Sequence, residues 1–217
     1  MEQDQQLWKP YPEEIKMTAQ GLVEVEVSLP QHWHVVMGAS GRTHQEVEAD
    51  QLISRGIPLY KRKGGGGTVL LGPGTIVVTV HAGVGHLFRS QAYFKAINEG
   101  IMEVFATWKP LNYHQKGHSD IAVENRKIVG SSIFRRKHHL LFQASILLEY
   151  DIALMGTVLK HPPREPDYRQ GRGHAAFLTS LRELGIETDE KRMVADLATQ
   201  LPQRLKTKID AADQDPA

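Results

Sequence analysis

The sequence contains no cysteine among its 217 residues, and this absence removes several kinds of chemistry. Disulfide bonds, thiolate metal sites and a catalytic thiol are all excluded. No apolar run approaches the roughly 20 residues that a membrane helix needs. The first six residues are polar and lack the apolar core of a signal peptide. We therefore expect a cytoplasmic protein with no membrane partner.

The chain also lacks a strong charge of either sign, since its net charge is +1. Nothing in that balance favours nucleic acid as a partner. Hydrophobic residues make up 41% and charged residues 24%, which is an ordinary globular balance that allows a real core. The length suits one domain with a small appendage, and we expect a monomer with a main domain at 1–184 and a helix and tail at 185–217.

Hydrophobic periodicity predicts the secondary structure. Alternating or β-branched stretches predict strands at 21–29, 33–37, 57–62, 75–80, 121–123, 127–130 and 140–150. The period becomes helical from residue 87 to Trp108, and further helical spacing falls at 41–54, 175–184 and 191–206, with Asp189 as a cap and a fraying tail from residue 210. This order favours an α+β domain with a mixed β-sheet flanked by helices.

A run of basic residues and glycines lies between two of the expected strands. Bare glycine backbone can bring N–H groups against an oxyanion, and basic side chains add charge for a phosphate or carboxylate. A flexible linker is the alternative. The run is not a Walker loop or a dinucleotide fingerprint, because neither Gly-Lys-Ser/Thr nor a helix follows it. Its residues are Lys61-Arg62-Lys63-Gly64-Gly65-Gly66-Gly67-Thr68.

A second segment places Asp120 shortly before Lys127, which begins an apolar strand. A partly buried lysine stem holds its ammonium in place, where it can neutralise an α-phosphate or a reacting carboxylate. Asp120 has the chemistry to hold a divalent cation that bridges phosphates. A solvated hairpin with surface charges is the alternative.

Together the two segments resemble the signatures of the lipoate–protein ligase family. The first family signature is a basic stretch, a serine, three glycines and Ala-Val, and then a short loop ending in Gly-Asn. It is similar to residues 62–69 and 72–75. The second, Asn-Asp-Leu and then Lys-Ile/Val-x-Gly-Ser, is similar to residues 119–121 and 127–131. The resemblance runs from about residue 35 to 181, and its His-Gly-Thr-Leu-Leu and Tyr-Arg-x-x-Arg segments fall on 143–147 and 168–172.

This resemblance implies a biotin/lipoate ligase catalytic fold and a two-step reaction. ATP and lipoate, or octanoate, would form an acyl-adenylate with Mg2+ held by Asp120, and a lysine of a lipoyl carrier domain would then displace AMP. Lys127 would be the catalytic residue, contacting the α-phosphate and the acyl carbonyl. The positions that match the nucleotide and acyl-adenylate site are Arg62, Lys63, Gly64, Gly65, Gly66, Gly67, Thr68, Val69, Gly74, Thr75, Asp120, Gly130, Ser131 and Ser145, and those that match the lipoate pocket are Gly38 and Val77.

The sequence departs from the family pattern at four positions. Gly64 replaces serine, Thr75 and Ser119 each replace asparagine, and Gln143 replaces histidine. These departures leave the acyl preference and the nucleotide contacts open. Many members also carry a C-terminal accessory domain, so we expect this chain either to use a separate small accessory protein or to manage without that part.

Other functions remain as alternatives. An octanoyl or lipoyl transferase of the same superfamily passes its acyl group through a cysteine thioester, and this chain has no cysteine. A biotin ligase usually carries Gly-Arg-Gly-Arg, which is absent, and a non-catalytic binding protein would not need Lys127. His32 and His34 share a strand face as a zinc pair would, but no third ligand is evident nearby. The basic cluster at 135–139 would suit an acidic carrier surface or a solvated loop.

Overall fold

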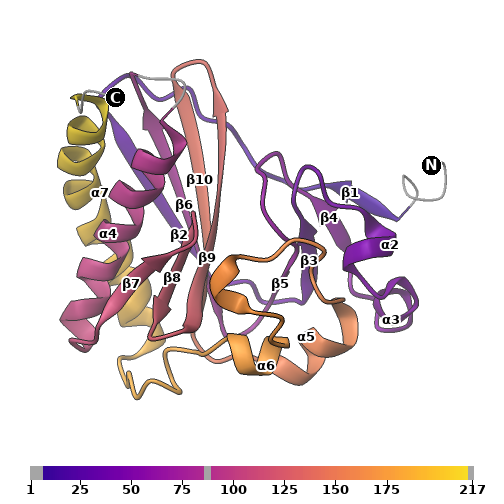
Figure 1. The fold of residues 1–217 in the computed structure, drawn as a ribbon. Helices are drawn as coiled ribbons and strands as arrows, with labels where there is room; N and C mark the ends of the chain where they lie inside the picture. Colours follow the sequence, from indigo (N-terminus) through magenta and orange to yellow (C-terminus); the bar gives the residue numbers. More distant parts are fainter. Residues whose placement is uncertain (1–6, 86–88, 215–217) are drawn as a thin grey trace.

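The computed structural model describes residues 7–85 and 89–214, which form two β-sheets with helices around them (Figure 1). The six-stranded sheet is antiparallel throughout, in the order β2-β6-β10-β9-β8-β7. Its strands are β2 Val23–Ser28, β6 Thr75–Gly83, β7 Tyr113–Lys116, β8 Asp120–Val123, β9 Arg126–Arg136 and β10 His139–Leu147.

Two helices, α4 Ser90–Trp108 and α7 Glu190–Gln214, cover one face of this large sheet (Figure 1). Alternate residues of β6, such as Val78 and Val80, join apolar residues of both helices in the main core. A Cβ at Gly100 of α4 would lie 2.6 Å from a methyl carbon of Leu205, so this glycine allows α7 to pack closely. The long helix at residues 90–108 is thus confirmed from Ser90 onward, whereas residues 86–88 lie outside the described residues.

The smaller sheet has mixed pairing and the order β1-β4-β3-β5. It consists of β1 Trp8–Pro10, β3 His34–Met37, β4 Leu59–Lys61 and β5 Val69–Leu71. Beside it lie the short helices α2 Thr43–Glu46, α3 Ala49–Ser54, α5 Ile152–Val158 and α6 His174–Phe177, together with the 3-10 turn Asp167–Arg169. These elements share a second core.

The face of the large sheet opposite α4 and α7 meets the small sheet. Because side chains alternate along a strand, Val77 of β6 points away from the helix-side residues Ile76 and Val78. The register places Ser145 of β10 beside Val77, and Gly130 of β9 beside Ser145. Three of the expected site positions therefore form one row across three strands.

The α+β class is confirmed, but the expected single mixed sheet is two sheets, and only the smaller one is mixed. The helix expected at 175–184 is wrong beyond Phe177, because the following backbone bonds to neighbouring strands: the amides of Thr179, Leu181 and Arg182 donate to Lys127, Leu147 and Leu148.

Three further boundaries differ from expectation. The strand expected to reach residue 150 ends at Leu147, since the next two amides donate to the carbonyl of Gly74. The helical stretch at 41–54 is two short helices, separated where Val47 bridges Leu159. Helix α7 continues past residue 210, where we expected fraying, to Gln214, and Asp189 caps it by accepting the amides of Lys191 and Arg192.

The sequence pattern did not predict β1, β5, β7 or α5, each of which has seven residues or fewer. Across residues 7–85 and 89–214, no helix combines the length and apolar character needed to cross a bilayer.

Candidate functional site

The centre of the candidate site is an ion pair between neighbouring strands. The Nζ atom of Lys127, on β9, lies 2.8 Å from Oδ1 of Asp120, on β8. The carboxylate of Asp120 is 8% exposed and the side chain of Lys127 is 23% exposed, so the pair is largely shielded from water. A fixed ammonium in such a place is suited to stabilising negative charge on a reacting phosphate or carboxylate.

The absence of a side chain at Gly130 leaves space for the end of the Lys127 side chain. A Cβ built at Gly130 would lie 2.8 Å from Nζ and 2.9 Å from Cε of Lys127, so the lysine end occupies the space that any other residue would fill. The hydroxyl of Ser145 donates to the carbonyl of Gly130 at 3.4 Å. Lys127, Gly130 and Ser145 are therefore brought together, as expected from the sequence.

Tyr168 contacts the carboxylate oxygen of Asp120 that Lys127 does not contact. Its hydroxyl donates to Oδ2 of Asp120 at 2.9 Å, so both carboxylate oxygens have a partner. Burial, and then the charge of Asp120, raise the pKa of the Tyr168 phenol, which keeps it a donor at all physiological pH values. The guanidinium of Arg172 donates a hydrogen bond of 2.8 Å to the backbone carbonyl of Tyr168. This bond fixes the segment that carries the tyrosine.

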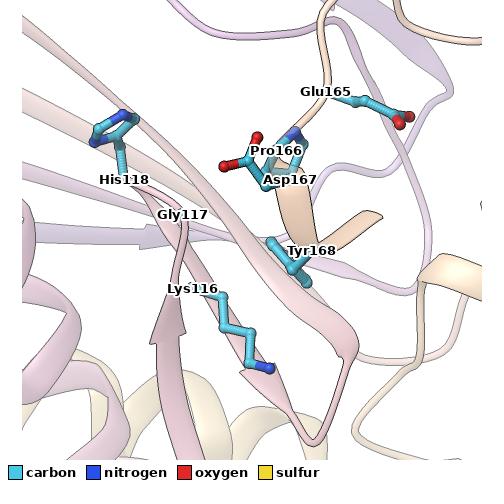
Figure 2. A pocket seen from close by; sticks show the side chains of 7 residues that line it. All are labelled: Lys116, Gly117, His118, Glu165, Pro166, Asp167 and Tyr168. Atoms are coloured by element: carbon cyan, nitrogen blue, oxygen red, sulfur yellow. The ribbon is translucent and has the colours of Figure 1, made fainter. Parts of the chain in front are cut away.

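A pocket of about 340 Å³ adjoins this tyrosine (Figure 2). It lies between the turn that joins β7 to β8 and the chain from Glu165 to Tyr168. Its lining carries charge of both signs and an aromatic ring, which suits a polar group better than an acyl chain. The residues are Lys116, Gly117, His118, Glu165, Pro166, Asp167 and Tyr168.

The side chain of Arg62 binds the glycine loop, residues 64–67, through its backbone carbonyls. The guanidinium donates to the carbonyls of Gly65 at 2.7 Å and Gly67 at 2.9 Å, and to that of Val36 at 3.2 Å. Arg62 is buried, and burial lowers its pKa to about 10, against the opposing effect of Glu13 and Glu46. Arg62 thus binds backbone carbonyls, so in this structure it shapes the loop.

The carbonyl contacts determine where the loop amides point. The C=O and N–H of one trans peptide point in opposite directions, so the N–H of Gly66 points away from Arg62. Within the described part of the chain, no hydrogen bond engages the N–H groups of Gly65, Gly66 or Gly67. Amides left unpaired in this way are available to an anion, and the anion site suggested by the glycine run stays a prediction.

The loop packs on the strand that carries the lysine. A Cβ at Gly64 would lie 3.0 Å from the hydroxyl of Ser132 on β9. On the other side, a Cβ at Gly38 would lie 2.0 Å from the carbonyl oxygen of Gly66, so Gly38 lets the loop approach β3. The hydroxyl of Thr68 donates to Glu46.

Several expected site residues have structural partners. The amide of Lys63 donates to the carboxylate of Glu13 and its ammonium donates to the Glu13 carbonyl. Thr75 bonds through its hydroxyl to Gly72, and Gly74 adopts a φ of +83° against the backbone of Glu149.

Ser131 lies apart from the row. It pairs with Ala144 of the helix-side core, and its hydroxyl donates to the Ser119 carbonyl at 2.6 Å. The neighbouring Ser132, which the sequence did not single out, contacts the loop.

A small apolar cluster lies where the two sheets meet. Val36 of β3 and Leu71 of β5 pack with Val77 of β6, and the partly buried Tyr60 and Val69 border them. Val69 and Val77, both expected at the site, are therefore neighbours. Through Val77 this cluster adjoins the row that contains Ser145 and Gly130.

The histidine pair gains no support as a metal site. The Nδ1 atom of His34 lies 2.9 Å from the carbonyl of His32, and its ring stacks near Tyr11. Among the residues that the structure describes, no group of three or more histidine, aspartate or glutamate side chains could hold a metal ion.

Comparison with known proteins gives a family match. The sequence profile of the family described as "Lipoyl protein ligase A/B catalytic domain" matches residues 25–202. A curated protein of Mycoplasma pneumoniae, named "Probable lipoate-protein ligase A", is 21% identical over 160 residues, which are 74% of this chain. The chain spans 42% of that relative's length.

Solved structures share the fold. A bipartite lipoate protein ligase of Thermoplasma acidophilum, described with its E2 lipoyl domain, superimposes with a TM-score of 0.73 at 18% identity, covering 88% of this chain and 78% of that one. A lipoate-protein ligase A bound with ATP gives a TM-score of 0.73 at 17% identity, with 88% and 80% covered. A lipoate protein ligase from T. acidophilum with bound lipoic acid gives 0.71 at 18%, with the same coverage.

Proposed function

Because the chain belongs to the lipoyl protein ligase A/B catalytic-domain family, we propose that it is an ATP-dependent lipoate–protein ligase. It activates lipoate, or octanoate, as an acyl-adenylate and transfers the acyl group to a lysine of a lipoyl carrier domain. The observation that carries this proposal is the position of Lys127. Its ammonium is held by Asp120 of β8. The glycine loop, whose amides at residues 65–67 have no partner among the described residues, approaches the strand of Lys127 where Gly64 lies beside Ser132.

The chemistry explains why these groups are needed together. A carboxylate does not acylate an amine at neutral pH, so one carboxylate oxygen first attacks the α-phosphorus of ATP and pyrophosphate leaves. The Lys127 ammonium stabilises the charge that develops there, and the loop amides bind the phosphate or acyl oxygens. The carrier amine then attacks the acyl carbonyl, the C–O bond to phosphate breaks, and AMP leaves.

The acyl chain needs an apolar surface beside these charges. The cluster of Val36, Leu71 and Val77 supplies it, bordered by Tyr60 and Val69. Exclusion of water beside this apolar cluster would protect the mixed anhydride from hydrolysis. The charged lining of the pocket beside Tyr168 makes that pocket unsuitable for the acyl chain.

Magnesium fits the site through Asp120, the carboxylate beside Lys127. Mg2+ is usually held by one or two carboxylates together with substrate phosphates, so a single protein ligand suffices here. When bound, the ion would neutralise phosphate charge. Lys127 and Tyr168 each contact one oxygen of Asp120. Each carboxylate oxygen has two lone pairs, so the ion could bind beside these contacts, which hold the carboxylate in position.

The partner in this proposal is a lipoyl carrier domain, and the T. acidophilum ligase with a similar fold is described together with such a domain. That ligase is also described as bipartite. A separate small accessory protein is therefore part of the proposal for adenylation. The chain itself would act as a cytoplasmic monomer.

The competing function is acyl transfer from a carrier thioester without ATP. Such a transferase would need a nucleophile to hold the acyl group, and the chain has no cysteine. One reaction offers octanoyl-carrier thioester without ATP, and a second offers free lipoate with ATP and Mg2+. We expect carrier modification only in the second, with release of AMP and pyrophosphate. Transfer in the first reaction alone would overturn the ligase proposal.

A control addresses the accessory protein. If neither reaction modifies the carrier, the second is repeated with chemically prepared lipoyl-adenylate in place of ATP and lipoate. Transfer from the adenylate means that only activation needs the accessory protein. Failure with the adenylate as well contradicts a catalytic role and favours a binding protein.

A further inference from the structure

The segment of residues 11–20, here called the strap, joins the two sheets. It lies before residue 25, where the family match begins. At one end the amide of Tyr11 donates to the carbonyl of Lys61 at 2.9 Å, and at the other Gln20 bridges Gly83 of β6. Between them Lys16 pairs with Glu24 and Glu26 of β2. The strap is therefore fixed to β4 and to the large sheet.

Glu13 of the strap reaches the base of the glycine loop. Its side chain is only 2% exposed, although its neighbour Glu14 is exposed. One carboxylate oxygen, Oε1, accepts the amide of Lys63, the residue that precedes the four glycines. The ammonium of Lys63 turns back to the carbonyl of Glu13 at 3.1 Å. Two bonds therefore join the strap to the start of the loop.

The second carboxylate oxygen of Glu13 lies in a buried region together with the side chain of Arg62. Oε2 is buried and has no hydrogen-bond partner among the described residues, and the same holds for Nε of Arg62. The two groups have opposite charge, and the charge of Glu13 acts on Arg62 more strongly than that of Glu46 or Tyr11. A buried carboxylate without a counter-charge would be costly. For Glu13 that charge comes from the Lys63 ammonium, 3.9 Å from Oε1, and from the guanidinium of Arg62.

Glu13 affects the proposed substrate site indirectly, through Arg62 and the glycine loop. Arg62 holds the carbonyls of Gly65 and Gly67, and these contacts leave the loop amides pointing away from it. We propose that Glu13 is a positioning residue of the ligase: by holding Lys63 and balancing Arg62, it fixes the glycine loop in the geometry that binds the acyl-adenylate. This role rests on the proposed function and assigns part of the site to a segment outside the family match.

The test compares variants of one strap. Glu13→Gln keeps the shape and an acceptor for the Lys63 amide but removes the charge, whereas Glu13→Ala removes both. Glu14→Gln is the matched control, because it makes the same charge change at an exposed neighbour. Exchange of a charged hydrogen bond for a neutral one weakens the contact that holds the loop by about tenfold, so we expect the KM for ATP and for the acid to rise by about that factor in Glu13→Gln. Because the loop binds substrate and transition state alike, kcat should change much less.

A second readout needs no turnover. Hydrogen exchange of the amides of residues 64–68 in the ligand-free protein should be about tenfold faster in Glu13→Gln than in Glu14→Gln, while other core amides keep their rates. If Glu13→Ala does not fold, Glu13→Gln carries the test, since its volume is unchanged. Normal loop exchange together with KM values close to wild type would overturn the proposal.

The opposite kinetic result is also decisive. If Glu13→Gln or Glu13→Ala lowers the KM, the strap obstructs the site and Glu13 does not position it. A wild-type protein that modifies the carrier neither with ATP and lipoate nor with lipoyl-adenylate would contradict the proposed function, yet the exchange comparison at the loop would still decide the role of Glu13.

Discussion

Lys127 and Asp120 face each other across the β8–β9 hairpin, with 2.8 Å between Nζ and Oδ1. Only six residues separate them along the chain, and the tight turn at Glu124, which has a φ of 54°, brings them together. Both members of the ion pair therefore lie within one short stretch of sequence.

We expect Lys127→Ala to fold and to lose adenylate formation. Removal of one preorganised electrostatic contact typically lowers the rate by roughly 100- to 1,000-fold. Mass measurement of the acyl-adenylate, beside circular dichroism of the same sample, checks this. Lys95→Ala is the control, because Lys95 is exposed on α4. Activity of Lys127→Ala within a few-fold of wild type would mean that the reacting phosphate binds elsewhere.

Gly130→Ala should affect catalysis far more than folding. The new methyl would lie 2.8 Å from the Lys127 ammonium, and a flexible side-chain end can move aside at little cost. The lysine would then leave its position, and kcat should fall. Gly156→Ala, in α5, adds a methyl with no atom within 4 Å and should stabilise the fold by about 0.5–1 kcal/mol. Equal kcat values for the two variants would contradict the role given to Gly130.

Gly66→Val should weaken binding of ATP and acid. Gly66 has a φ of +90°, where a β-branched residue is strained by about 1–3 kcal/mol. Gly56→Val is the matched control, because Gly56 also has a positive φ, +63°, but has no atom near its Cβ position and lies away from the site. Denaturant unfolding should show destabilisation in both variants. Ligand titration should show lost affinity only in Gly66→Val, and equal affinities would make the loop purely structural.

Acid should destabilise the protein partly through His174, the first residue of α6. Burial, and then the charge of Arg169, lower its pKa from 6.5 to about 4. The unfolded state then binds more protons between these values, so stability falls as the pH drops from 6.5 towards 4. In His174→Gln the melting temperature should depend less on pH over this range, whereas His32→Gln, at an exposed position, should resemble wild type.

The parts of the fold and site that the sequence predicted are those encoded locally. The apolar spacing from Phe94 to Trp108 predicted α4, and the glycine run predicted a loop with free amides. The strand carrying Lys127 followed from the apolar residues after it. In each case the signal lies within a few residues of the feature.

The remaining parts depend on partners that are far away in the chain. Arg62 belongs to a basic run, but its partner Val36 is 26 residues away, and only that packing turns it towards carbonyls. Glu13 meets Lys63 across 50 residues, and no local pattern marks it. Tyr168 lies in a segment that resembles a family motif, yet its bond to Asp120 spans 48 residues.

Tyr168→Phe tests whether the segment after Pro166 supports the reacting pair. The substitution leaves the ring in place but removes the hydroxyl that donates to Oδ2 of Asp120. A buried carboxylate oxygen that loses its donor costs about 1–3 kcal/mol, so the protein should be less stable by up to that amount. Tyr113→Phe is the control, because the Tyr113 hydroxyl donates to the Lys109 carbonyl instead.

The kinetic consequence separates support of Asp120 from general packing. With Tyr168 absent, Asp120 is held by Lys127 alone, and its position relative to the phosphates is less defined. We expect Tyr168→Phe to need a higher Mg2+ concentration for half-maximal adenylate formation, while Tyr113→Phe keeps the wild-type requirement. A loss of stability with an unchanged Mg2+ requirement would mean that Tyr168 packs the segment without orienting Asp120.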